Sequence, residues 1–110
     1  GVGARRHPRV YRRVGVVCRT GAQTRAVMGN ISRGGLALQS AVPLKLGEEV
    51  TVEVSIERFP DPIELQGSVV HVSEASNGRY RAGVRFADLP PDRARALEDL
   101  IQFLLRTAPP

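Results

Sequence analysis

Two groups of residues in this sequence have the chemistry to bind an anionic ligand. The first is an arginine cluster near the N-terminus, made up of Arg5, Arg6, Arg9, Arg12 and Arg13. A guanidinium is planar and always charged, so it can pair with a phosphate or a guanine edge and can stack on a base. Pro8 disfavours helical backbone before it and lacks an amide donor, so we expect residues 1–13 to form a flexible arm. A solvated basic tail is the alternative interpretation.

The second group lies where a predicted strand ends in a turn of two glycines. Two-residue alternation points Ile31 toward a core. The opposite face then carries Met28, Asn30 and Ser32. Gly34 and Gly35 tolerate unusual backbone angles and allow another molecule to approach the main chain. The amide and the hydroxyl form hydrogen bonds without carrying charge, so a bound anion would be neutralised by the arginines. A plain strand end is the alternative, because these residue types favour turns.

The composition is that of one folded domain with a basic surface. At 110 residues the chain supports one ordinary core, and its 42% hydrophobic and 25% charged residues argue against wholesale disorder. The net charge of +5 favours an anionic partner. The codon usage of a GC-rich genome would also enrich arginine, so the placement of the arginines carries more weight than their total.

Several function classes are disfavoured by what the sequence contains. There is no plausible nucleophile–base pair, phosphate loop or metal-ligand set, so we expect neither enzymatic activity nor a cofactor. Cys18 is the only cysteine, which indicates a core residue in a reducing, cytoplasmic location. No run is long enough to span a membrane, and no signal-peptide pattern is present. The chain begins with Gly1 rather than Met, so we expect it to be an excised domain or to carry a cloning remnant.

The hydrophobic pattern predicts short strands joined by turns, followed by one helix. The expected strands are Val14–Arg19, Arg25–Ile31, Leu36–Ser40, Glu49–Glu57, Ile63–Val72 and Arg79–Phe86. The alternation slips near Gly67, where we expect a bulge or a tight bend. Strands in this arrangement indicate a small antiparallel barrel or a closed sandwich.

The helix is expected to run from about Pro90 to Arg106. Its apolar stripe comprises Ala94, Leu97, Leu100, Ile101 and Leu104. The stripe would pack on the barrel or on a second copy, which leaves a homodimer open. The expected organisation is an arm at 1–13, strands at 14–89 and the helix within 90–110, all in one domain.

The arm and the turn together resemble the PilZ domain family. Arg5 and Arg9 match an R-x-x-x-R motif, and a second motif, N-x-S-x-x-G, is matched by Asn30, Ser32 and Gly35. The resemblance extends over nearly the whole chain. It implies an all-β fold, a six-stranded antiparallel split barrel with one C-terminal helix, that binds cyclic di-GMP, a bacterial second messenger.

The resemblance also implies a role for each motif residue. Arg5 and Arg9 would bind phosphate and guanine, and Arg6 would add a contact or stack on a base. Of the second motif, Asn30 would bond to guanine, Ser32 to guanine or phosphate, and Gly35 would allow close approach of the main chain. The arm would become ordered around the nucleotide and present a new surface to a downstream protein partner that the sequence does not identify.

Other functions remain as alternatives. A PilZ-like interaction module would share the fold but bind no nucleotide. A nucleic-acid-binding barrel is disfavoured because the aromatic residues are scattered rather than gathered in a stacking platform. His71 is interpreted as a packing or peripheral residue. A solvated surface is the expected place of Arg79, Arg81 and Arg85.

Overall fold

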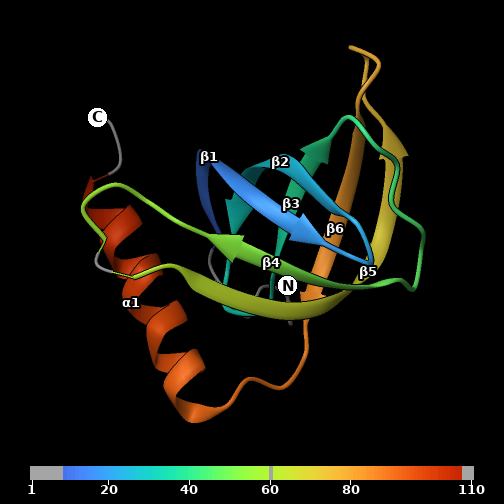
Figure 1. Cartoon of the computed structure of the whole chain (residues 1–110). Helices are drawn as coiled ribbons and strands as arrows, with labels where there is room; N and C mark the ends of the chain where they lie inside the picture. The colour runs from blue at the N-terminus through green and yellow to red at the C-terminus, as the bar shows by residue number, and fades with distance from the viewer. Residues whose placement is uncertain (1–8, 60, 108–110) are drawn as a thin grey trace, which may run out of the picture.

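The computed structural model describes residues 9–59 and 61–107, which fold into a closed β-barrel with a helix at one end (Figure 1). The strands are β1 (Val10–Arg19), β2 (Gln23–Ile31), β3 (Gly35–Ser40), β4 (Glu49–Val54), β5 (Ile63–Glu74) and β6 (Tyr80–Phe86), and the helix is α1 (Pro91–Thr107). The prediction of a six-stranded antiparallel barrel with a C-terminal helix is confirmed. Most of the expected arm, residues 1–8, lies outside the described residues, so the division into arm, barrel and helix stays a prediction.

The barrel closes because β1 pairs with strands on both of its sides. The strand order is β1-β2-β3-β6-β5-β4, and β4 returns to β1 through pairs such as Cys18 with Val52. Every pairing is antiparallel. Arg19 lies across this seam, with Nη1 2.9 Å from Glu53 Oε1 of β4 and Nη2 2.6 Å from Glu64 Oε2 of β5. One guanidinium therefore bridges three strands where the barrel closes.

The barrel interior is filled by the inward row of each strand. The largest fully buried side chains include Met28, Ile31, Leu36 and Leu65, and Cys18 is buried among them as expected. Burying a side chain of this size stabilises the fold by roughly 1.5–3 kcal/mol. The alternation thus fixes which face of each strand is left outside to carry polar groups.

The helix packs its apolar stripe against the barrel of its own chain. Leu97, Leu100, Ile101 and Leu104 are buried there. Phe103 contacts Phe59, with ring centroids 5.4 Å apart. The expected member Ala94 is exposed, and Ala96 takes the partly buried place instead. Among the described residues, no helix is long and apolar enough to cross a membrane.

Some strand ends differ from the sequence-based expectations. β1 begins at Val10 rather than Val14, because a bulge between Tyr11 and Val14 lets pairing with β2 continue past the irregular stretch. β4 ends at Val54 rather than Glu57, since the chain turns just after it. In that turn Arg58 has a φ of 75°.

The structure has bulges at two places where the sequence pattern did not predict them. The expected bulge at Gly67 is wrong, because Gly67 pairs regularly with Val50 and Phe86, and the register instead shifts at Val70. On β2 the register shifts between Met28 and Asn30, which returns Met28 to the core on the same side as Ile31. A bulge turns the following side chains to the other face, so strict alternation fails across it.

Candidate functional site

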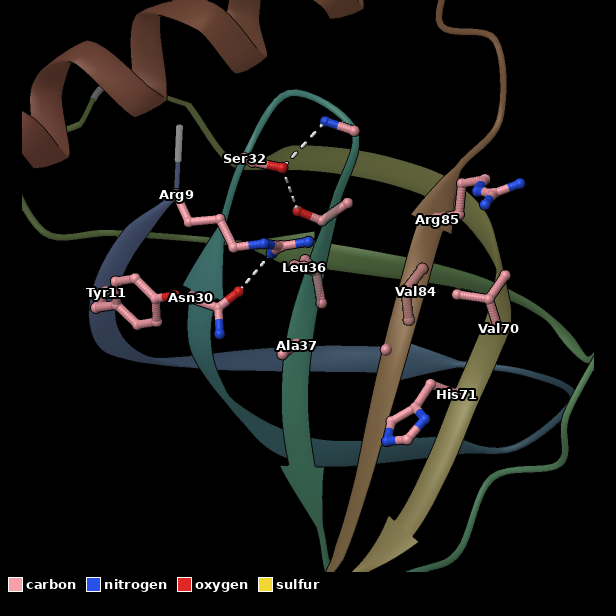
Figure 2. Close-up of a pocket in the computed structure, with 13 residues that line it drawn as sticks. Arg9, Tyr11, Asn30, Ser32, Leu36, Ala37, Val70, His71, Val84 and Arg85 are labelled. Atoms are coloured by element: carbon pink, nitrogen blue, oxygen red, sulfur yellow. Dashed lines mark hydrogen bonds between the residues drawn. The ribbon is translucent and has the colours of Figure 1, made fainter. Parts of the chain in front are cut away.

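A pocket of about 740 Å³ lies on the outside of the barrel, across the end of β2, the start of β3 and the facing parts of β6 and β5 (Figure 2). Its volume is within the roughly 300–1,000 Å³ that small-molecule sites usually occupy. The floor of the pocket is made by small residues, because Ala37 of β3 is paired with Gly83 of β6. The lining residues are Arg9, Tyr11, Asn30, Ser32, Gly34, Gly35, Leu36, Ala37, Val70, His71, Gly83, Val84 and Arg85.

Arg9 and Asn30 bring the two sequence motifs together at the pocket. Arg9 Nη1 donates to Asn30 Oδ1 at 2.5 Å, although the two residues are 21 positions apart. The contact forms because Arg9 immediately precedes β1, and Tyr11 of β1 is paired with Asn30 of β2. This bond uses one guanidinium N–H of Arg9 and the side-chain amide oxygen of Asn30. Other guanidinium N–H groups and the amide nitrogen can therefore donate to a ligand.

Ser32 shapes the turn between β2 and β3. Its hydroxyl accepts a hydrogen bond from the Gly34 amide at 3.2 Å, and its own amide donates to the Gly35 carbonyl at 2.8 Å. The side chain is buried, so the hydroxyl is oriented by the turn (Figure 2). Ser32 consequently has a structural role in addition to any contact with a ligand.

Gly35 is required by the barrel itself. A Cβ placed on Gly35 would lie 2.1 Å from the carbonyl oxygen of Val84, a distance that real Cβ atoms do not show. The backbone is held there because Gly35 pairs with Arg85 of β6, and the Phe86 amide donates to the Gly34 carbonyl at 2.9 Å. The third residue of the second motif therefore has a reason to be glycine that does not depend on a ligand.

Arg33, the variable position between Ser32 and the glycines, contacts α1 instead of the pocket. Its Nε is 2.6 Å from Glu98 Oε1, and its Nη2 is 3.1 Å from Glu98 Oε2. Hydrogen bonds from Arg33 and then from Gln102 lower the pKa of Glu98. The motif turn is thereby joined to the helix.

Three of the pocket's polar side chains, those of Arg85, His71 and Tyr11, were not assigned to the site from the sequence. Arg85 was expected on a solvated surface and His71 at the periphery, but both line the pocket on the side opposite Arg9 (Figure 2). Tyr11 is 73% exposed beside Asn30. The strand order β3-β6-β5 brings Arg85 beside Gly35 and His71 beside Gly83, and that order does not follow the sequence.

The pocket is suited to an anion. Two arginines and a histidine line it, and none of its described lining residues is acidic. Among the described residues, no group of three or more His, Cys, Asp or Glu side chains could hold a metal ion. Arg5 and Arg6 lie outside the described residues, so their predicted roles remain predictions.

Comparisons with solved structures identify the same fold in several bacterial proteins. The PilZ domain of YcgR from Escherichia coli, solved with c-di-GMP, has a TM-score of 0.79 and 20% identity, covering 94% of this chain and 93% of that one. The K. pneumonia MrkH–c-di-GMP complex has a TM-score of 0.77 and 21% identity, covering 97% and 55%. The Bacillus subtilis inhibitor of motility (MotI/DgrA) has a TM-score of 0.76 and 19% identity, covering 96% and 54%. The chain thus spans about half the length of MrkH and MotI.

The sequence itself was also compared with curated proteins and with family models. No curated protein matches this chain. The model described as PilZ domain matches residues 4–103, which include both motifs, all six strands and most of α1. The chain therefore belongs to the PilZ domain family.

Proposed function

We propose that this domain is a bacterial receptor for cyclic di-GMP and binds it in the pocket beside Arg9. The observation that carries the proposal is the Arg9–Asn30 hydrogen bond, which joins the R-x-x-x-R and N-x-S-x-x-G motifs at a pocket without described carboxylates. Two structures with the same fold, the YcgR PilZ domain and MrkH, were solved with c-di-GMP and support the choice of ligand. A second messenger acts inside the cell, so the proposal includes a cytoplasmic location.

Each group has a role that suits its chemistry. Arg9, with Arg5 and Arg6 from the preceding segment, would bond to phosphates and to the O6 and N7 acceptors of guanine. Asn30 would donate its amide to a guanine acceptor. Ser32 and Gly35 would present the turn, whose main chain a ligand can approach.

Binding would be signalled by the segment that carries Arg5 and Arg6. Its arginines would exchange solvent for charge-assisted bonds to the nucleotide, and the energy of these bonds would offset the entropy lost on ordering. The ordered segment and the nucleotide would then form a surface for a downstream protein partner.

Calorimetric titration with cyclic di-GMP, linear pGpG and GTP tests the receptor function. We expect selective binding of the cyclic dinucleotide that collapses in Arg9→Ala. Arg95→Ala is the matched control, because Arg95 is an exposed arginine of α1 that does not line the pocket. If the folded wild-type chain shows no binding at high nucleotide concentration, the receptor function is wrong. The domain would then act as an interaction module.

A further inference from the structure

A second, smaller cavity adjoins the nucleotide pocket on the outside of the barrel. It has a volume of about 280 Å³ and shares Asn30 and Ala37 with the first pocket. Its other polar lining groups are Arg13 of β1, Gln39 of β3 and Arg81 of β6. The sequence motifs include neither arginine.

The strand register places this cavity along the strands from the first pocket. Asn30, Ala37 and Gly83 form one row across β2, β3 and β6, and Val27, Gln39 and Arg81 form the next row on the same face. Outward rows are two residues apart, which corresponds to about 7 Å along a strand. A ligand bound in the first pocket can therefore extend one of its groups, such as a phosphate, into the second cavity.

The alternation along β1 determines which arginine faces the cavity. Arg12 extends toward α1, where its Nη1 donates to the Leu104 carbonyl at 3.4 Å and to Thr107 Oγ1 at 3.1 Å. Successive strand residues face opposite sides, so Arg13 is left on the outer face, where it is exposed and lines the cavity.

The charge in this cavity is not neutralised by the described part of the chain. Arg13 and Arg81 form no ion pair with a described residue, and no described lining residue is acidic. Two cations around a small polar cavity would favour an anion, and the guanidinium fork is suited to phosphate oxygens. The volume is below the usual range for a whole small-molecule ligand, which indicates that the cavity holds one group rather than a complete dinucleotide.

We propose that Arg13 and Arg81 form an auxiliary phosphate subsite that extends the nucleotide site along β1 and β6. The identity of the nucleotide rests on the proposed function. The phosphate belongs either to the nucleotide in the first pocket or to a second nucleotide stacked on it. If the phosphate belongs to the nucleotide in the first pocket, loss of the two arginines lowers the affinity only. If it belongs to a second nucleotide, their loss changes the binding stoichiometry.

The test compares the wild-type chain with Arg13→Gln, Arg81→Gln and the double variant by calorimetric titration with cyclic di-GMP. Arg25→Gln is the control, since Arg25 is exposed on β2 and lines neither cavity. A fall in stoichiometry from two to one in the double variant supports the subsite with a second nucleotide. Unchanged stoichiometry with affinity reduced about tenfold for each lost charge-assisted bond supports the subsite with a single nucleotide. If Arg9→Ala abolishes binding while the double variant matches wild type, the subsite is wrong and the receptor function stands.

A second measurement does not depend on the receptor function. Inorganic pyrophosphate is titrated into labelled protein while the arginine Nε–Hε signals are followed by NMR. We expect saturable shifts of the Arg13 and Arg81 signals, each assigned by its Gln variant, with the Arg25 signal unmoved. If neither signal shifts, or if Arg25 shifts equally, the subsite is overturned even where cyclic di-GMP binds.

Discussion

The side chain of Arg33 in the β2–β3 turn forms an ion pair with Glu98 of α1, with Nε and Oε1 2.6 Å apart. Arg12 of β1 bonds to the C-terminal end of the same helix, at Leu104 and Thr107. The helix is therefore attached to the turn that follows Asn30 and to the strand that follows Arg9. A ligand that moves either element would act directly on the helix.

The ion pair should make stability depend on pH in acid. Arg33 lowers the pKa of Glu98 below its ordinary value of 4.5, so the folded state favours the carboxylate. This contribution is complete above the ordinary pKa and is lost as pH falls through the lowered one. We expect the thermal midpoint of wild type to fall more than that of Glu98→Gln between pH 5 and pH 3. Equal falls of the thermal midpoint in wild type and Glu98→Gln would contradict this prediction. Added salt should reduce the difference between the two proteins, because the paired groups are partly exposed and are screened by salt.

Gly35→Ala should destabilise the barrel before any ligand is added. The new Cβ would overlap the Val84 carbonyl, and overpacking of this kind typically costs about 1–3 kcal/mol. Gly15→Ala is the matched control, because a Cβ at Gly15 meets nothing within 4 Å. Urea unfolding of both variants measures the difference. If Gly35→Ala unfolds at the same urea concentration as wild type, the close approach to Val84 does not constrain the turn.

Ser32→Ala should lower stability as well as nucleotide affinity. Removing the hydroxyl takes away the acceptor for the Gly34 amide, and a lost hydrogen bond typically costs about 1 kcal/mol. Urea unfolding without nucleotide gives the structural part, and titration of the folded variant gives the binding part. A variant with reduced affinity but unchanged stability would show that the hydroxyl acts on the ligand alone.

Cys18 should be unreactive in the folded protein. The side chain is fully buried, and burial first, then the charge of Glu48, raises the pKa of its thiol above 9.0. A thiol-specific reagent at pH 8 should modify it slowly in buffer and rapidly in urea. The unfolded state loses this proton first, so the thiol's contribution to stability declines as pH rises above about 9. Cys18→Ala should lack that part of the alkaline decline, and rapid modification of native protein would contradict the burial.

Local patterns predicted the strands where the alternation was unbroken. Val50, Val52 and Val54 face inward as expected, since β4 has no bulge. The pattern failed at Met28 and Val70, because a bulge depends on the neighbouring strand as well as on the bulged one. Register shifts are set by pairing partners, which a single strand's sequence does not contain.

From the sequence, only the site residues that belong to the two motifs could be predicted. The residues Arg9 and Asn30 were expected in one site by resemblance, and they are in contact. Arg85 and His71 carried no local signal, since their place in the pocket comes from the order of β3, β6 and β5. Arg13 and Arg81 are likewise gathered by strands far apart in the chain.

Closure of the barrel limits how this domain can recognise another protein. Each of the six strands in the described part of the chain has a neighbouring strand on both sides, although β1 pairs with β4 only over Val16–Arg19. Adding a strand to the sheet, a common route for peptide capture and for aggregation, is therefore confined to short segments such as Val10–Gly15, which have no paired residue on the β4 side. Recognition should accordingly rely on side chains, and surface substitutions that leave folding intact should be able to separate partner binding from nucleotide binding.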